Sequence, residues 1–235
     1  MAYVIFDETV IQGELEGLRF DPDSFKLLED YITNETILIN ERDAFAKYNI
    51  RARQLLPYYG FRYENIPNDP FELHLQKRFG FLPPIFSIGN IVTLNAQARD
   101  VLESIEPNVH QYIPIKIVNK AGGPEFEPYW MLNVCTRVVA TNIEKSNLKI
   151  TERIDCTNLP DGKYTMFFGK KIPTSITPKQ DYMVLKLNKD VVQGRTFWFE
   201  WKLSHLFISD AFVEALKIAG INPGYVHNKF HAEEL

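Results

Sequence analysis

Four side chains in the carboxyl-terminal tail are of types that bind metal ions. His227 and His231 are four residues apart, and Glu233 and Glu234 follow them. On a helix, this spacing would place both imidazole rings on one side, where they could hold a metal ion. The proline and glycine at positions 223 and 224 interrupt the helix that such a site needs, and no third ligand is well placed. We therefore interpret the tail as a mixed polar terminus and expect no metal and no cofactor.

Cys135 and His110 would supply a nucleophile and a general base if the fold brought them together. Cys135 lies in the pattern of a strand, without the tight turn or helix start that exposes a nucleophile and lowers its pKa. A buried or half-buried structural thiol is therefore the preferred interpretation. The second cysteine is Cys156, and two cysteines make neither a zinc site nor a disulfide framework. The motif G-x-S-x-G does not occur, so we predict no catalytic residue.

An aromatic run beside an arginine is the candidate for binding a protein partner. It consists of Tyr58, Tyr59, Phe61, Arg62 and Tyr63. Tyrosine and arginine are enriched at the centres of protein interfaces, where they combine a large contact area with hydrogen-bonding groups. Packing within the core or between lobes is the commoner role of such rings, and a protein interface is the alternative. We predict that the run contributes to a partner-binding surface.

The charge balance excludes some classes of partner. The chain has 26 Lys and Arg against 30 Asp and Glu, which gives a net charge of -4. Nucleic-acid binding normally needs clustered Lys and Arg, so we expect no nucleic-acid partner. Near the start, Asp7, Glu8, Glu14 and Glu16 form an acidic cluster. A solvated face is the preferred interpretation of this cluster, and an acidic patch that faces a partner is the alternative.

Neither a membrane nor a nucleotide is expected as a ligand. No apolar run approaches the roughly 18 residues that a membrane helix needs, and the start, MAYVIFDETV, lacks the basic flank and long apolar core of a secretory signal. We therefore expect a cytoplasmic protein. The glycine-containing stretches AGGPEFEP and FFGKK lack the spacing of a phosphate-binding loop. We therefore do not expect a small-molecule substrate.

The clearest predicted element lies near the carboxyl end, in the stretch LFISDAFVEALKIAGI. After a short apolar strand, Ser209 has the side chain of a helix N-cap. Phe212, Leu216 and Ala219 then recur at spacings of four and three, which predicts one apolar helix face. Gly220 follows where a helix commonly ends in the left-handed conformation. Upstream, the stretch NIVTLNAQARDVLESIEP predicts the same strand-to-helix unit with Asn95 as the cap.

The remaining pattern predicts an α+β fold with a mainly antiparallel sheet, a few packed helices and two lobes. In the first third we expect helices at residues 22–32 and 41–56, a turn at 33–35, strands at 3–6 and 36–39, and a helix cap at Asp23 or Ser24. Further strands are predicted at residues 130–140, 148–154, 163–168, 182–187 and 197–203. A proline-rich connection up to Pro84 suggests a division into residues 1–84 and 85–235.

From about Phe86 to the end, the sequence resembles a family of bacterial polymorphic-toxin immunity proteins. The resemblance rests on the segments IVTLNAQARDVLESIEPNVHQYIPIKI, PYWMLNVCTRVVATNIEKS and LFISDAFVEALKIAGI. Family members similarly show a helix that ends before an hQ..P segment, a Y..LNV strand and a closing LF.S..F..AL..AGI. The resemblance therefore implies an immunity domain over residues 85–235, preceded by a variable lobe where specificity for one toxin resides.

The resemblance implies that the chain binds one cognate toxin domain and neutralises it in a stoichiometric complex, without catalysis. The toxin would be made by the same cell or delivered by a kin cell during interbacterial competition, through a contact-dependent or type VI-like secretion route. Two alternatives stay open. The chain could be an enzyme that reverses the modification made by the toxin, or a non-catalytic interaction module in a larger assembly.

Overall fold

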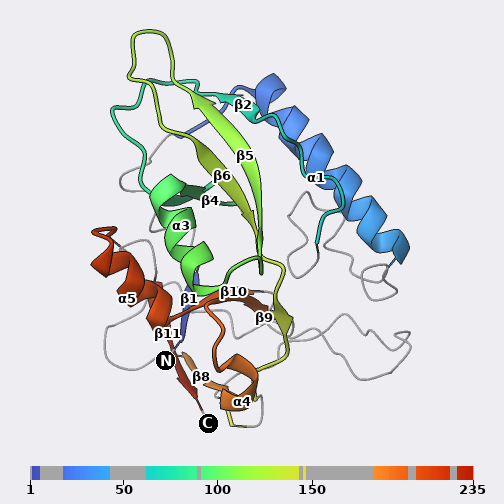
Figure 1. The fold of residues 1–235 in the computed structure, drawn as a ribbon, viewed down its shortest axis with the longest axis vertical. Helices are drawn as coiled ribbons and strands as arrows, with labels where there is room; N and C mark the ends of the chain where they lie inside the picture. The colour runs from blue at the N-terminus through green and yellow to red at the C-terminus, as the bar shows by residue number, and fades with distance from the viewer. Residues whose placement is uncertain are drawn as a thin grey trace.

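The protein, seen here as a computed structural model, is built from two β-sheets with helices packed against them (Figure 1). The structure describes residues 2–5, 18–42, 62–88, 91–142, 145–146, 183–200, 205–222 and 227–234. Within these residues, one sheet has five strands and the other has six. The predicted α+β class is therefore confirmed.

The five-stranded sheet has the strand order β2-β5-β6-β4-β3. Its strands are β2 (Phe71–His74), β3 (Ile85–Ile88), β4 (Ile91–Asn95), β5 (Gln111–Val118) and β6 (Tyr129–Asn133). β2 pairs with β5 in parallel, and the other pairs are antiparallel. Successive residues of a strand point to opposite faces, so Ile113 and Ile115 lie on one face of β5 whereas Pro114 and Lys116 lie on the other.

The long helix α1 (Pro22–Arg42) covers the isoleucine face of this sheet (Figure 1). Its cap is Asp21, whose Oδ1 accepts from the backbone N–H groups of Asp23 at 3.1 Å and Ser24 at 3.2 Å. The predicted cap at Asp23 or Ser24 is therefore wrong by two or three residues, because Asp21 reaches the free amides of the first turn. Leu28 is fully buried against the sheet.

α1 continues through the segment that the sequence predicted as a turn at 33–35 and a strand at 36–39, so both predictions are wrong. The reason is a tertiary contact made by Glu35, which is 2% exposed. Its carboxylate accepts from the backbone N–H of Glu64 at 2.6 Å and from Nδ2 of Asn65 at 2.8 Å. Such contacts override weak local propensities. The second predicted helix, at 41–56, lies outside the described residues beyond the end of α1.

The six-stranded sheet has the strand order β7-β9-β10-β1-β11-β8. Its strands are β1 (Ala2–Ile5), β7 (Arg137–Val138), β8 (Met183–Leu187), β9 (Phe197–Glu200), β10 (His205–Ser209) and β11 (His227–Glu234). β7 pairs with β9 in parallel, as does β11 with β8. Each sheet is therefore mixed, but antiparallel pairs predominate in both, as predicted. The strands predicted at 148–154 and 163–168 lie outside the described residues.

The two edge strands of the six-stranded sheet are joined by the chain that follows β7. Thr141 forms a bridge with Leu187 of β8. The backbone N–H of Asn142 donates to the carbonyl of Lys186, and that of Asn188 donates to the carbonyl of Ala140, both at 2.8 Å. A short helix, α4 (Lys189–Val192), follows. This closure satisfies backbone groups that an open sheet edge would expose.

Helices α3 (Ala96–Ile105) and α5 (Asp210–Ile218) pack against each other and bridge the two sheets (Figure 1). Both predicted caps are confirmed: Asn95 accepts from the N–H of Ala98 at 2.9 Å, and Ser209 accepts from that of Phe212 at 3.2 Å. Gly220 follows α5 with a positive φ of 76°, as predicted for a helix stop.

One hydrophobic core holds these helices and both sheets together. Its buried residues are Val92, Leu94, Ala98, Leu102, Leu132, Val134, Phe197, Leu206, Ile208, Phe212, Val213, Leu216 and Ile221. They come from β4 and β6 of the five-stranded sheet, from β9 and β10 of the six-stranded sheet, and from the two capped helices. Burial of this apolar area is the main term that fixes how the sheets sit together.

The predicted division at residue 84 does not coincide with a break in either sheet. β2 lies before residue 84 and pairs with β5, which lies after it. β1 lies at the start of the chain and pairs with β10 and β11 near its end. The prolines before residue 85 mark an irregular connection, but the strands on either side of it share hydrogen bonds.

Candidate functional site

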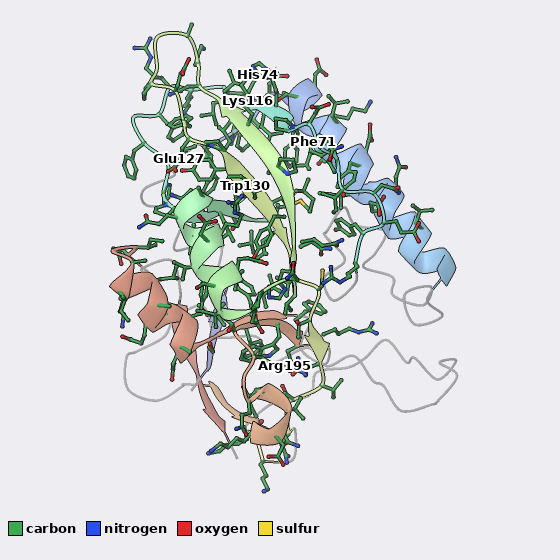
Figure 2. The ribbon with its side chains drawn as sticks, in the orientation of Figure 1. Phe71, His74, Lys116, Glu127, Trp130 and Arg195 are labelled. Carbon is green, nitrogen blue, oxygen red and sulfur yellow. The ribbon has the colours of Figure 1, made fainter. Side chains whose placement is uncertain are left out.

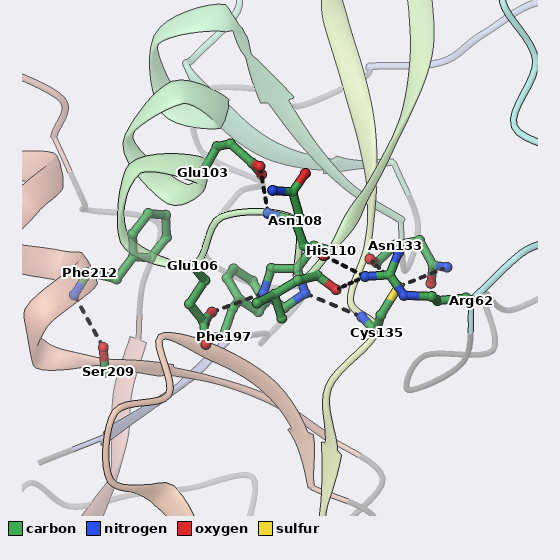
Figure 3. A network of polar contacts seen from close by, with 11 residues as sticks. Arg62, Glu103, Glu106, Asn108, His110, Asn133, Cys135, Phe197, Ser209 and Phe212 are labelled. Atoms are coloured by element: carbon green, nitrogen blue, oxygen red, sulfur yellow. Dashed lines mark hydrogen bonds and ion pairs between the residues drawn. The ribbon is translucent and has the colours of Figure 1, made fainter.

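A buried polar cluster lies where α3 ends and β5 begins (Figure 3). Glu106 is 7% exposed and His110 is 4% exposed. The Oε2 atom of Glu106 lies 3.0 Å from Nε2 of His110, and it also accepts from the backbone N–H of Phe197 at 3.0 Å. Phe197 belongs to β9 of the other sheet. We call Glu106, His110 and Cys135 the buried junction, since they connect the two sheets.

The hydrogen bonds of His110 assign a tautomer to its ring. Nδ1 accepts from the backbone N–H of Cys135 at 3.3 Å, so this nitrogen carries no proton. Nε2 then carries the proton and donates it to the carboxylate of Glu106. Both ring nitrogens are therefore engaged with groups other than the thiol.

The thiol of Cys135 is not activated by its surroundings. It is half-buried, and its Sγ lies 3.4 Å from the carbonyl oxygen of Asn133 and 3.6 Å from Oε1 of Gln111. Burial raises the pKa of this thiol to about 11, although the positive charge of Arg62 opposes the shift. The predicted half-buried position of this thiol is confirmed. The fold does place His110 beside Cys135, but through the backbone, which is not the geometry of a nucleophile and its base.

Of the predicted aromatic run, the structure describes Arg62 and Tyr63. Nη2 of Arg62 donates to the carbonyl oxygens of Asn108 at 2.6 Å and Val109 at 3.0 Å. Tyr63 is 3% exposed and packs in the core beneath α1. Its backbone exchanges two hydrogen bonds with the side-chain amide of Gln111, at 2.7 and 2.9 Å. These contacts fasten the start of the segment to the end of α3 and to β5.

The other members of the run, Tyr58, Tyr59 and Phe61, lie outside the described residues. Partner binding by the run therefore stays a prediction. Among its described members, Arg62 is exposed and Tyr63 is buried. The acidic cluster at residues 7–16 also lies outside the described residues.

The histidines of the tail lie on a strand instead of a helix. His227 and His231 both belong to β11. Among the residues that the structure describes, no group of three or more His, Cys, Asp or Glu side chains could hold a metal ion.

Among the described residues, α3 covers part of the face of the five-stranded sheet opposite α1 (Figure 2). α3 buries Leu94 and Leu132 on this face. Beyond α3, the same face carries side chains that are half-buried or exposed. They are Glu72, His74, Pro114, Lys116 and Trp130, and we call them the open face.

Two contacts order the side chains of the open face. The guanidinium carbon of Arg99, from α3, lies 4.0 Å from the centroid of the Trp130 ring, which is a cation–π contact. Nζ of Lys116 lies 2.5 Å from Oε1 of Glu72, whose Oε2 lies 3.7 Å from Nε2 of His74. The hydrogen bond with Lys116 lowers the pKa of Glu72, and the same bond raises the pKa of Lys116.

An α+β scaffold with a structural polar junction and a partly uncovered sheet face has the character of a protein-binding module. Comparison with known families agrees, because a family model described as an immunity protein family, Imm11, matches residues 20–227. This match spans most of the chain, so the chain belongs to the Imm11 immunity protein family, and its role is in toxin neutralisation with a toxin as partner.

The family match extends the resemblance seen in the sequence, because it begins at residue 20, well before Phe86. No curated protein matches the chain. Among the helices of the described residues, none is long and apolar enough to cross a membrane.

Sequence reasoning missed Glu106 and the open face. Glu106 and His110 are four residues apart, a spacing that brings two side chains together on a helix. Pro107 lies between them and ends the helix, so the spacing did not predict their contact. Trp130 was assigned to an alternating strand, which is correct, but the strand pattern does not reveal which part of a sheet face stays uncovered.

Proposed function

We propose that the protein neutralises its cognate toxin by forming a one-to-one complex that blocks the toxin, without turnover. The observation that carries this proposal is the family match over residues 20–227. Occlusion requires only a complementary surface of about 800 Å² on each partner, which a chain of this size provides readily.

The chemistry of the described residues supports binding over catalysis. The His110 ring donates to Glu106 and accepts from a backbone amide, so its two nitrogens serve the fold. The pKa of the Cys135 thiol, raised to about 11 by burial, makes it a poor nucleophile near neutral pH. The contacts of His110 and Cys135 are thus explained by their role in the fold, without a catalytic role.

The compartment and delivery route follow from where the toxin acts. We propose that the protein works in the cytoplasm against a toxin with a cytosolic target, delivered by a contact-dependent or type VI-like route between competing bacteria. The segment at residues 58–63 is proposed to contribute to the toxin interface, since its aromatic rings and Arg62 are of the types enriched at hot spots.

Titration against the toxin tests the proposal. The tagged protein is mixed in increasing ratios with the toxin domain encoded beside it, and complex mass and residual toxicity are measured together. We expect one stable complex and an end of toxicity at one equivalent. An unrelated immunity protein of similar charge is the control and should leave toxicity unchanged.

Protection at far less than one equivalent would contradict the proposal and favour an enzyme that reverses the toxin's modification. Rescue of growth without any detectable complex would have the same meaning. Absence of both complex and rescue would indicate an interaction module with another partner.

A further inference from the structure

Trp130 of the open face lies on a central strand of the five-stranded sheet. Trp130 is on β6, which pairs with β4 through Leu94 and with β5 through Pro114. Behind β6, Tyr129 and Met131 are buried in the core beneath α1. A side chain that is already ordered costs little further entropy on binding, so Trp130 is a favourable anchor.

The residue types of the open face are those of an interface centre. Trp130 is half-buried, with Arg99 stacked on its ring at 4.0 Å. Tryptophan and arginine are enriched at binding hot spots, which are surrounded by contacts that contribute little energy but exclude water, and the rim of an interface is polar. Glu72 and Lys116, with side chains 49% and 59% exposed, occupy such a rim position.

Charge on this side of the sheet is mostly negative. Glu125 and Glu127 are exposed residues of the segment that leads into β6. Glu125 is close enough to raise the pKa of Lys116 further. Asn95 holds Glu127 by a hydrogen bond of 2.9 Å.

The balance of these groups leaves an excess of carboxylates. Arg99 is neutralised by Asp100, at 2.8 Å. Glu72 and Glu125 both lie close enough to Lys116 to raise its pKa, so carboxylates outnumber ammonium groups among these side chains. A complementary partner therefore presents Lys and Arg around a pocket or edge that accepts an aromatic ring.

We propose that the cognate toxin domain docks on the open face with a basic surface and packs against Trp130. This inference rests on the proposed function and names the surface that would serve it. The acidic rim speeds association with a basic toxin, whereas Trp130 holds the complex together once formed.

Binding measurements on matched variants test the surface. Wild type is measured first against the toxin domain, then Trp130→Ala and Glu125→Lys, each with its thermal unfolding midpoint. We expect Trp130→Ala to raise Kd about 30-fold through faster dissociation. Glu125→Lys should raise Kd about fivefold through slower association, with a smaller effect at high salt.

The controls alter similar side chains elsewhere on the surface. Leu27→Ala removes an apolar side chain that is 64% exposed on α1, on the other side of the sheet. Glu214→Lys reverses a charge on α5, where the side chain is 61% exposed. Both variants should bind within about twofold of wild type, because surface residues outside an interface contribute little.

Chemical acetylation of wild type provides a readout that needs no substitution at the face. Lys116 and Lys217 have side chains 59% and 51% exposed, so both should be modified in the free protein. In the complex, Lys116 should be protected and Lys217 should not.

A one-to-one complex with unprotected Lys116 and unchanged affinity of Trp130→Ala would overturn the docking surface while leaving the proposed function intact. Failure of wild type to bind the toxin at all would overturn both.

Discussion

Within the described part of the chain, glutamate–histidine pairs occur in two opposite settings. In the buried junction, Glu106 and His110 lie 3.0 Å apart with side chains 8% and 0% exposed. On the open face, Glu72 and His74 lie 3.7 Å apart with side chains 49% and 51% exposed. The same two residue types therefore occur once sealed between the sheets and once in solvent.

The difference lies in the further partners of each pair. The buried pair is completed by the backbone amides of Phe197 and Cys135, and the Phe197 amide is buried, so it would lose its acceptor without gaining water if Glu106 were removed. The exposed pair is completed by Lys116, and each of these charges has water as an alternative partner. The buried pair thus supports the fold, whereas the exposed pair is available to a partner at little cost in stability.

Removing the glutamate from each pair should separate the two roles most clearly. Glu106→Ala leaves the N–H of Phe197 and the ring of His110 buried without an acceptor, so we expect a loss of about 3 kcal/mol in the free energy of unfolding. Glu72→Ala should leave the urea midpoint unchanged, because that carboxylate is exposed. Urea denaturation of both variants measures the contrast.

The conservative variant Glu106→Gln checks the cause of that loss. Its amide keeps one acceptor oxygen, so it should lose less stability than Glu106→Ala. Equal urea midpoints for Glu106→Ala and Glu72→Ala would show that the buried junction does not hold the sheets together.

The thiol of the buried junction should be slow to react. In a Cys156→Ser background, Cys135 is the one remaining cysteine. A pKa raised from 9.0 to about 11 leaves about 100-fold less thiolate at pH 7.5, so alkylation by iodoacetamide should be about 100-fold slower than in the protein unfolded in urea. The rate should climb as the pH rises toward 11. A native rate equal to or above the unfolded rate would instead identify an activated cysteine.

The N-cap residues of α3 and α5 differ in the hydrogen bonds that they form outside their own helix. Ser209 caps α5 and accepts from Phe212. Asn95 caps α3 and also donates to Glu127 beside the open face, at 2.9 Å. We expect Ser209→Ala to cost about 1 kcal/mol and Asn95→Ala about 2 kcal/mol in thermal or urea unfolding.

Two conservative variants test this reading of the caps. Ser209→Thr should retain most of the stability, because threonine also accepts from the first turn. Asn95→Asp keeps the cap but places a second carboxylate against Glu127, so it should recover only part of the loss. A cost for Asn95→Ala no larger than that for Ser209→Ala would show that the bond to Glu127 adds nothing.

The sequence was sufficient for elements whose signals are local. The caps at Asn95 and Ser209 and the stop at Gly220 follow from side-chain chemistry within one helical turn. The sequence was insufficient to predict elements whose extent depends on a contact with a distant residue. α1 continues past residue 33 because Glu35 binds the backbone of Glu64, and no local signal encodes that partner.

The candidate sites show the same limit. The pattern around Cys135 predicted its half-buried position correctly, although the residue lies between β6 and β7 and not within the predicted strand. The open face depends on which part of a sheet α3 leaves uncovered, and this is set by the length of α3 and by the pairing of β2 with β5 across more than forty residues. Three members of the predicted partner-binding run lie outside the described residues. The binding measurements on variants of the open face therefore test which of the two surfaces contacts the toxin.

The smallest expected effect concerns the charges of the open face. Lys116→Met removes the partner that lowers the pKa of Glu72, so that pKa should rise toward its ordinary value. A group with a lowered pKa in the folded state adds stability above its unfolded pKa and loses it as the pH falls through the folded pKa. Because both side chains are exposed, solvent screens this contribution, and the unfolding midpoint of the variant should match wild type at pH 7 and at pH 4.

Carboxyl titration by NMR would follow Glu72 directly, in wild type and in Lys116→Met. A Glu72 pKa that does not rise would mean that the contact with Lys116 is not maintained in solution. A large fall in the midpoint would mean that the open face, like the buried junction, supports the fold, and the contrast between the two glutamate–histidine pairs would then disappear.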